Sequence, residues 1–208
     1  MTESTHSDTN GGNSDGRRLR SVASRARISQ AFISLVQDGR VTPTAHEVAL
    51  RAEVGLRSVF RHFTDMDALF HEMAVHSEQL LARSLPPAQG RARSERELSD
   101  IIAERAEAFE KITPFQAAAA THQHASSVLR EHRATFNKLQ RSTLMRALPD
   151  QLGSDKELLE ALDMALSFDT WQRLRKEQRL GKDRAMRVVM MTCEALLGGG
   201  AKARRPKS

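Results

Sequence analysis

The chain has 208 residues and a mass of 23.2 kDa, which is enough for one large domain or for a small domain joined to a larger one. Its one cysteine, Cys193, excludes an intramolecular disulfide, and no stretch approaches the roughly eighteen apolar residues of a membrane helix. Aromatic residues make up only 4%, whereas Ala, Leu, Arg and Glu are abundant, as is typical of an all-α protein. Because the first sixteen residues lack the apolar run of a secretory signal, we expect a cytoplasmic protein.

The formal net charge of +6 is distributed unevenly along the chain. Residues 17–62 carry nine arginines against three acidic residues, and residues 202–208 carry four basic residues and no acidic one. The long middle of the chain is nearly neutral. A compact basic module on a neutral helical body is typical of a nucleic-acid-binding protein whose body senses a ligand or oligomerises. We therefore expect double-stranded DNA as a partner.

Apolar spacing and helix-terminating residues predict four helices in the first part of the chain. Gly39 stands where a C-terminal cap glycine belongs, and Thr44 with Glu47 forms the capping-box pattern at the start of a short helix. Asp65 caps the fourth helix, which ends before two consecutive prolines. The four predicted helices cover residues 21–38, 44–52, 56–63 and 66–85.

The same signals predict five more helices in the remainder of the chain. Capping patterns begin at Ser94 and Ser154, Pro114 interrupts one helix and starts the next, and Gly181 lies between the last two. No alternating strand pattern of useful length occurs. The sequence therefore predicts an all-α fold of about nine helices. The five helices cover residues 94–112, 115–120, 122–148, 155–180 and 183–198.

The second and third helices, joined by a short turn, have the dimensions of a helix-turn-helix motif. Such a motif needs a small apolar core that holds one helix ready to enter a major groove. In the third helix, Arg57, Ser58 and Arg61 are polar and can donate hydrogen bonds to base edges. The predicted core residues are Phe32, Leu35, Val48, Ala49, Val54, Val59 and Phe63.

The segments ARISQAFISLVQDGR and PTAHEVALRAEVGLRSVFRHFTDMDALF resemble the DNA-binding domain of the tetracycline-repressor (TetR) family of bacterial regulators. The resemblance covers residues 25–72 and includes the helix pattern over 44–52 and the element Phe60-Arg61-His62-Phe63. It implies a homodimer that places two recognition helices on a near-palindromic operator. It also implies that the rest of the chain binds a small-molecule effector and that the protein is a repressor.

Three positions differ from the pattern that is usual in that family. Glu53 replaces the turn glycine, Gly55 replaces a serine or threonine before the recognition helix, and Met66 replaces a lysine that contacts phosphate. If residue 53 adopts a left-handed conformation, glutamate costs roughly 1 kcal/mol more than glycine there.

The DNA-contacting residues are expected on the third helix and its neighbours, although the polar residues of that helix could also form an ordinary solvated face. By the resemblance, Phe60 stands where a tyrosine contacts phosphate; without the hydroxyl, we expect it to pack in the core or against a sugar. His62 matches a histidine near the DNA backbone, and an arginine from the basic arm is expected to reach the backbone or the minor groove. The predicted DNA-binding residues are Arg25, Thr44, Arg57, Ser58, Phe60, Arg61 and His62.

The body holds the candidates for effector binding and dimerisation. By the resemblance, its scarce aromatic residues line an effector pocket, although each could equally be an ordinary core residue: Phe109, Phe115, Phe136, Phe168 and Trp171. The last two predicted helices carry long apolar stripes, which predict a four-helix interface shared by two subunits. The predicted interface residues are Leu158, Leu162, Leu166, Met186, Val189, Cys193 and Leu197.

No phosphate-binding glycine loop, nucleophile motif or zinc pattern occurs in the sequence. His122 and His124 are two residues apart, so on a helix they point in nearly opposite directions and cannot share a metal ion. We therefore predict no catalytic residue, no metal, no cofactor and no membrane association. Two alternatives remain open: a helical enzyme or metal-binding protein with an incidental basic arm, and a DNA-binding activator of the same fold without effector control.

Charge and helix pattern together predict the organisation of the chain. A disordered tail precedes a helix-turn-helix DNA-binding domain, and an effector-binding and dimerisation domain precedes a basic tail. The four segments are 1–16, 17–72, 73–200 and 201–208.

Overall fold

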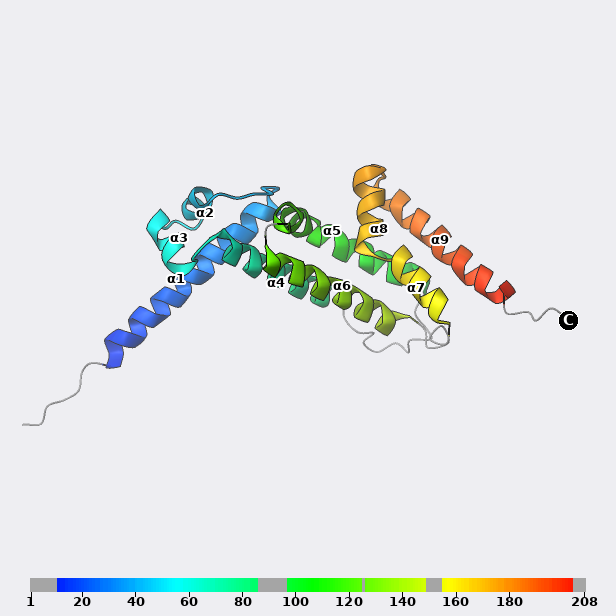
Figure 1. Ribbon diagram of the computed structural model, residues 1–208, viewed down its shortest axis with the longest axis horizontal. Coiled ribbons are helices and arrows are strands. Elements are labelled where there is room, and N and C mark those ends of the chain that lie inside the picture. The colour runs from blue at the N-terminus through cyan, green and yellow to red at the C-terminus, as the bar shows by residue number, and fades with distance from the viewer. Residues whose placement is uncertain (1–10, 86–96, 125, 149–154, 204–208) are drawn as a thin grey trace, which may run out of the picture. The chain divides into compact units, whose positions relative to one another are not determined.

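The computed structural model describes residues 11–85, 97–124, 126–148 and 155–203 (Figure 1). Within these ranges the chain forms nine α-helices and one π-helical segment, and no strand, so the all-α prediction is confirmed. The elements are α1 (Gly11–Gln37), α2 (Ala45–Arg51), α3 (Leu56–His62), α4 (Met66–Ser84), α5 (Leu98–His122), α6 (Ser127–Ala147), α7 (Lys156–Ala165), α8 (Phe168–Gln172), the π-helix η3 (Arg173–Glu177) and α9 (Lys182–Ala203).

The chain divides into two compact units, Met1–Met73 and Ala74–Ser208. Helices α1 to α3 lie in the first unit and α5 to α9 in the second, while α4 begins in the first and ends in the second. None of the helices in the described part of the chain is both long enough and apolar enough to cross a membrane.

Helix α1 begins at Gly11, well before the start that apolar spacing predicts at Ser21. Arg17, Arg18, Leu19 and Arg20 between the two points favour a helix, and no proline interrupts it. The predicted disorder is therefore wrong for residues 11–16, and residues 1–10 lie outside the described part. The C-terminal cap is as predicted: Gly39 has a φ of 92°, and the N–H groups of Gly39 and Arg40 donate to the last turn of the helix.

The first unit is built around α1, against which α2 and α3 pack (Figure 1). Phe32 of α1 meets Phe70 of α4 edge to face, with 5.0 Å between ring centroids, and both rings are buried. Val59 and Phe63 bury the inner side of α3 against this core. All the predicted core residues of the unit are buried except Val54, which is half-buried. This core fixes which side of α3 faces outward.

Helix α2 begins at the predicted capping box. The hydroxyl of Thr44 accepts from the backbone N–H of Glu47 at 3.2 Å, and the Glu47 carboxylate accepts from the backbone N–H of Thr44 at 2.8 Å. The Thr44 N–H and the neighbouring Arg40 side chain lower the pKa of Glu47 to about 2. A local sequence pattern therefore defines the start of the helix-turn-helix motif.

The turn between α2 and α3 contains a residue in the left-handed region. Glu53 has a φ of 54°, a conformation that is normally occupied by glycine. Gly55, which caps α3 in extended conformation, supplies no side chain to bond the first turn. The turn thus consists of a strained residue, Glu53, followed by a helix whose first turn has no side-chain cap.

Replacing Glu53 with glycine is expected to raise the free energy of unfolding by about 1 kcal/mol, because glycine has no Cβ to clash in this conformation. Urea titration followed by circular dichroism measures the change. Glu53→Ala is the matched control, since it removes the same charge but keeps a Cβ. Equal stability of the glycine and alanine variants would contradict the assignment of strain to Glu53.

In the second unit, α5 is a single helix from Leu98 to His122, so the predicted interruption at Pro114 and the separate helix over 115–120 are wrong. Proline removes one backbone donor from a helix. The buried side chains of Phe109, Ile112 and Phe115 on both sides of it keep the helix packed against the core. Helix α6 begins after a Ser126 cap rather than at residue 122, and the predicted capping residue Ser94 lies outside the described residues.

The predicted helix over 155–180 is instead divided into three elements. Asp155 caps α7, whose last residue is Ala165, and Ser167 caps α8 by accepting from the backbone N–H of Thr170 at 3.1 Å. The π-helix η3 follows, and Arg179, with a φ of 54°, ends this run before α9. The cap at Ser167 starts a new helix even though the apolar pattern continues through it. The predicted capping residue Ser154 lies outside the described residues.

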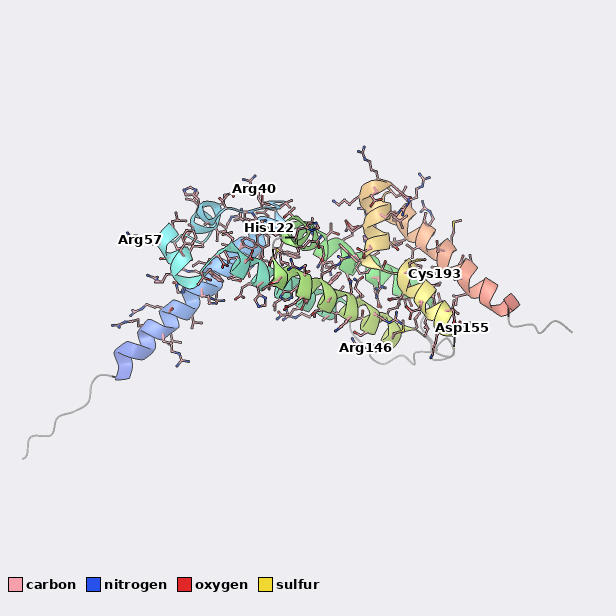
Figure 2. All side chains as sticks on the ribbon, in the orientation of Figure 1. Arg40, Arg57, His122, Arg146, Asp155 and Cys193 are labelled. Carbon is pink, nitrogen blue, oxygen red and sulfur yellow. The ribbon has the colours of Figure 1, made fainter. Side chains whose placement is uncertain are left out.

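The core of the second unit joins the C-terminal part of α4 with α5, α6, α7, α8 and α9. It contains an aromatic cluster in which Phe168 meets Phe109 and Phe136 edge to face at 5.5 and 5.7 Å. Cys193 lies on α9, is fully buried, and belongs to the same core (Figure 2). Burial raises the pKa of its thiol to about 11.

Candidate functional site

The outer side of α3 carries a shallow surface hollow that combines cationic and apolar side chains. It is lined by Leu56, Arg57, Phe60 and Arg61. All four are exposed, and Figure 2 labels Arg57 on this helix. Among the described residues neither arginine of the hollow forms an ion pair. The face therefore presents two cations that no other residue in the described part of the chain neutralises.

Phe60 is half exposed, so the expectation that it packs in the core is wrong. Val59 and Phe63 face the core, and a helix turns about 100° per residue, which directs Phe60 to the outside. Leu56, which sequence reasoning missed, is also exposed, at 44%. Two large apolar side chains beside two arginines can pack on sugars or on the methyl groups of thymine.

Ser58 is half-buried and lies beside the hollow rather than in it. Its hydroxyl accepts from the guanidinium of Arg61 at 3.4 Å. Ser58 therefore orients Arg61 along the outer face of α3. The structure brings Arg57, Ser58, Phe60 and Arg61 together as the sequence predicts, on one side of one helix.

Arg25 is committed to contacts within the first unit. Its guanidinium donates to the backbone carbonyl of His62 at 2.8 Å, pairs with the Glu72 carboxylate, and stacks on Phe63 at 4.3 Å from the ring centroid. These contacts link α1 to the end of α3 and to α4. Because the side chain already has three partners, this arrangement does not favour the predicted DNA contact. We assign Arg25 to positioning α3 instead.

His62 ends α3 with its imidazole half-buried and its Nε2 atom buried without a hydrogen-bond partner. Burial lowers its pKa, and the nearby charges of Arg61 and Arg25 lower it further. The ring is therefore neutral near pH 7. Thr44, at the start of α2, is exposed, but its hydroxyl is engaged in the capping box. The structure brings neither of these residues into the hollow on α3.

The basic arm forms the N-terminal part of α1. Arg17, Arg18, Arg20 and Arg27 are all exposed, as is Leu19 at 70%. These arginines have no ion-pair partner among the described residues. The arm therefore adds uncompensated positive charge to the same unit as α3.

The second unit contains a cavity that only two of the predicted pocket residues line. Its walls are Ile102, Arg105, Ala106, Phe109, Ala165, Leu166, Ser167, Trp171 and Val189. Phe109 and Trp171 were predicted from the sequence. Phe115, Phe136 and Phe168 are buried in the core but do not line this cavity. Sequence reasoning missed Arg105, which looks like an ordinary surface residue of a helix.

Four of the predicted dimer-interface residues are already buried within one chain. Leu162, Leu166, Val189 and Cys193 are at most 5% exposed and pack in the core of the second unit, so they are wrong as interface residues. An apolar stripe shows that a helix buries one side, but not what covers it. Leu158, Met186 and Leu197 are half-buried.

Two methionines that the prediction omitted are the exposed apolar residues of α7 and α9. Met164 on α7 is 66% exposed and Met191 on α9 is 68% exposed. Helices α7 and α9 pack against each other within the unit. Their outward sides thus carry large apolar side chains that nothing in the described part of the chain covers.

No protein-family model matches the chain, and no curated protein matches it by sequence. Solved structures do match it. A transcriptional regulator from Rhodococcus sp. Rha1 is 19% identical, with a TM-score of 0.62 over 84% of this chain and 96% of its own. The multidrug binding protein EbrR, complexed with imidazole, is 20% identical, with a TM-score of 0.54 over 81% and 93%.

A TetR transcriptional regulator from Rhodococcus sp. RHA1 is 18% identical, with a TM-score of 0.54 over 84% of this chain and 95% of its own. These alignments extend over nearly the whole length of each solved structure. The likeness therefore extends beyond the helix-turn-helix motif into the helices of the second unit. The chain has the fold of TetR transcriptional regulators, as the resemblance of residues 25–72 predicts.

Proposed function

We propose that the chain is a TetR-family regulator of transcription: a homodimer that binds a near-palindromic operator through α3 and acts as a repressor that a small-molecule effector releases. The observation that carries the proposal is the outer side of α3, where Arg57 and Arg61 are exposed, unpaired within the described residues and adjacent to Phe60. Arginine can donate two hydrogen bonds to a guanine edge. The exposed arginines of α1 support the proposal by adding attraction to phosphate.

Selection of binding sequences from random duplex DNA with the purified protein tests this function. We expect enrichment of two inverted half-sites, with centres about one helical turn or a multiple apart. Binding to the selected operator should weaken with salt, with a slope of log K against log salt that corresponds to several phosphates at about 0.9 per contact. No enriched sequence and a slope near zero would contradict DNA binding.

Dimerisation is proposed through the outward sides of α7 and α9. Met164 and Met191 are more than half exposed in one chain, and a dimer would cover them. In a dimer, binding of one α3 to its half-site holds the second α3 at a high effective concentration near the other half-site, so the dimer binds the operator more tightly than a monomer does. The interface thus has a direct consequence for operator affinity.

An activator or a regulator without effector control is the second candidate of the same fold. The cavity lined by Phe109 and Trp171 favours effector control, and EbrR, a multidrug binding protein, shares the fold. Operator release is the distinguishing measurement. A regulator whose operator affinity no bound small molecule alters would fit the second candidate instead.

The apolar side chains of the α3 hollow predict that thymine methyl groups contribute to recognition. Replacing the thymines of a half-site one at a time with deoxyuridine should lower affinity by about tenfold at the position that Phe60 contacts. The Phe60→Ala variant should show the same affinity for the thymine and deoxyuridine operators. Leu50→Ala, which changes an exposed apolar residue of α2, should keep the preference for thymine.

A further inference from the structure

Arg105 is the one arginine among the described residues that is buried. Its side chain extends from α5 into the core of the second unit, where the residue is only 3% exposed. Transferring an unpaired guanidinium from water to an apolar interior is costly. A charge in this position therefore needs compensation from the surroundings or from a ligand.

The protein compensates Arg105 only in part. Its Nε donates to the backbone carbonyl of Leu166 at 2.9 Å, where α7 ends, and its Nη1 donates to the carbonyl of Gln140 at 3.4 Å. Its guanidinium also lies 5.1 Å from the ring centroid of Phe109. The Nη2 group is buried and has no hydrogen-bond partner. A guanidinium has five N–H donors, so part of the fork is unused.

No carboxylate among the described residues is close enough to pair with Arg105. Asp163 is the acidic residue whose charge acts on it, but the carboxylate of Asp163 is bound to Arg141 at 2.9 Å. Burial lowers the pKa of Arg105 to about 10, so the group is still protonated at neutral pH. Arg105 is therefore a buried cation that no carboxylate of the described residues binds directly.

This charge lines the cavity already described. Apart from Arg105 and Ser167, the lining is apolar, with Phe109 and Trp171 as its largest side chains. The indole N–H of Trp171 already donates to Glu110 at 2.9 Å, so this group is not available to a ligand. The cavity thus offers one cation, one hydroxyl and aromatic walls.

We propose that this cavity binds the carboxylate group of a small organic acid, with Arg105 as the cation that recognises it. A carboxylate accepts two parallel hydrogen bonds from a guanidinium fork, and the Nη2 group left without a partner can donate one of them. The apolar part of the acid would pack on Phe109 and Trp171. The acid would then be the effector, a consequence that rests on the proposed function, whereas the binding itself does not.

Room for the acid has to come from a movement of the cavity wall. The cavity has a volume of about 10 Å³, which is no more than one water molecule requires. Leu166 and Ser167 form one wall, at the break between α7 and α8. Widening this break would cost the bonds that the hydroxyls of Ser167 and Thr170 donate to the carbonyl of Met164, at 2.8 and 2.6 Å, but no backbone bond within either helix. We infer that the acid enters by separating the ends of α7 and α8.

The test compares carboxylates with neutral amides of the same shape. Butyrate and benzoate, with butyramide and benzamide as their isosteres, are titrated into the full-length protein by calorimetry and in thermal unfolding. We expect one carboxylate per chain, a rise in the unfolding midpoint, and binding at least about tenfold tighter than that of the amide. Equal binding of acids and amides, or no binding of either acid, would overturn the proposal.

Variants assign the binding to Arg105. Arg105→Met should fold, because an apolar side chain of similar length often replaces a buried charge without loss of stability, and it should lose the preference for carboxylates. Arg133→Met is the control, since Arg133 is half-buried, pairs with Asp169 and does not line the cavity. Wild-type affinity of Arg105→Met for benzoate would overturn the assignment. If that variant does not fold, Arg105→Lys, which lacks the fork, should bind benzoate at least tenfold more weakly.

A DNA-binding measurement separates this proposal from the proposed function. If benzoate binds through Arg105 but the chain selects no DNA sequence, the acid site stands and the regulatory function fails. If the chain selects an operator but neither acid binds, the function stands and the acid site fails. Because each measurement is made without the other ligand, one failure cannot be mistaken for the other.

Discussion

Replacing Arg57 and Arg61 together with alanine is expected to weaken binding to the selected operator by about 2–6 kcal/mol, the sum of two base contacts at about 1–3 kcal/mol each. The two side chains lie on the outer side of α3, away from the core residues Val59 and Phe63. The change should therefore leave the free energy of unfolding nearly constant. Fluorescence anisotropy with labelled operator measures the affinity.

The single variants and a control distinguish base contacts from backbone contacts and from a general loss of positive charge. Arg57→Ala should relax preference at one position of each half-site, and Arg61→Ala at a different one, whereas a backbone contact would weaken all sequences alike. Arg173→Ala, which removes an exposed arginine from η3 in the second unit, should leave affinity unchanged. Normal operator binding by the double variant would show that α3 is not the recognition helix.

Met191→Glu is expected to convert the proposed dimer to a monomer and to lower operator affinity by a factor of about 10² or more, since the avidity supplied by the second DNA-binding unit is lost. Met191 is 68% exposed in one chain, so the monomer should remain folded. A dimer would instead bury an unpaired carboxylate in its interface. Light scattering gives the mass, and anisotropy gives the affinity.

Two comparisons distinguish an interface effect from a general one. Val128→Glu places the same charge on an exposed apolar position of α6 and should leave the protein dimeric. Leu166→Glu and Val189→Glu change residues in the core of a single chain. They should instead lower the free energy of unfolding of the second unit by several kcal/mol. A Met191→Glu variant that stays dimeric and binds operator normally would place the interface elsewhere.

Local signals in the sequence predict the helix-turn-helix motif closely. The reciprocal bonds of Thr44 and Glu47 and the glycine cap at Gly39 involve neighbours in the chain, so a pattern of a few residues is sufficient to find them. The arginines of α3 are also found this way, because Val59 and Phe63 define the opposite side of a short helix. The sequence raised a left-handed conformation at Glu53 only as a condition, and the structure shows that this residue adopts it.

Features that depend on distant parts of the chain could not be predicted. Pro114 stays within α5 because core packing outweighs the loss of one backbone bond. The burial of Leu162 and Val189 within one chain is decided by how α7 and α9 pack, and a stripe of apolar residues carries no such information. Arg105 reaches the core only because α5 lies between partners that are remote in sequence.

The buried thiol of Cys193 has a consequence for the chemistry of the folded chain. It is the only sulfhydryl group of the protein, it is fully buried in α9, and its pKa is raised to about 11. Reaction with oxidants and alkylating reagents requires an accessible thiolate. Such reagents therefore react with Cys193 only when α9 separates from the helices packed against it. In the folded second unit, the protein should behave toward thiol reagents as if it had no cysteine.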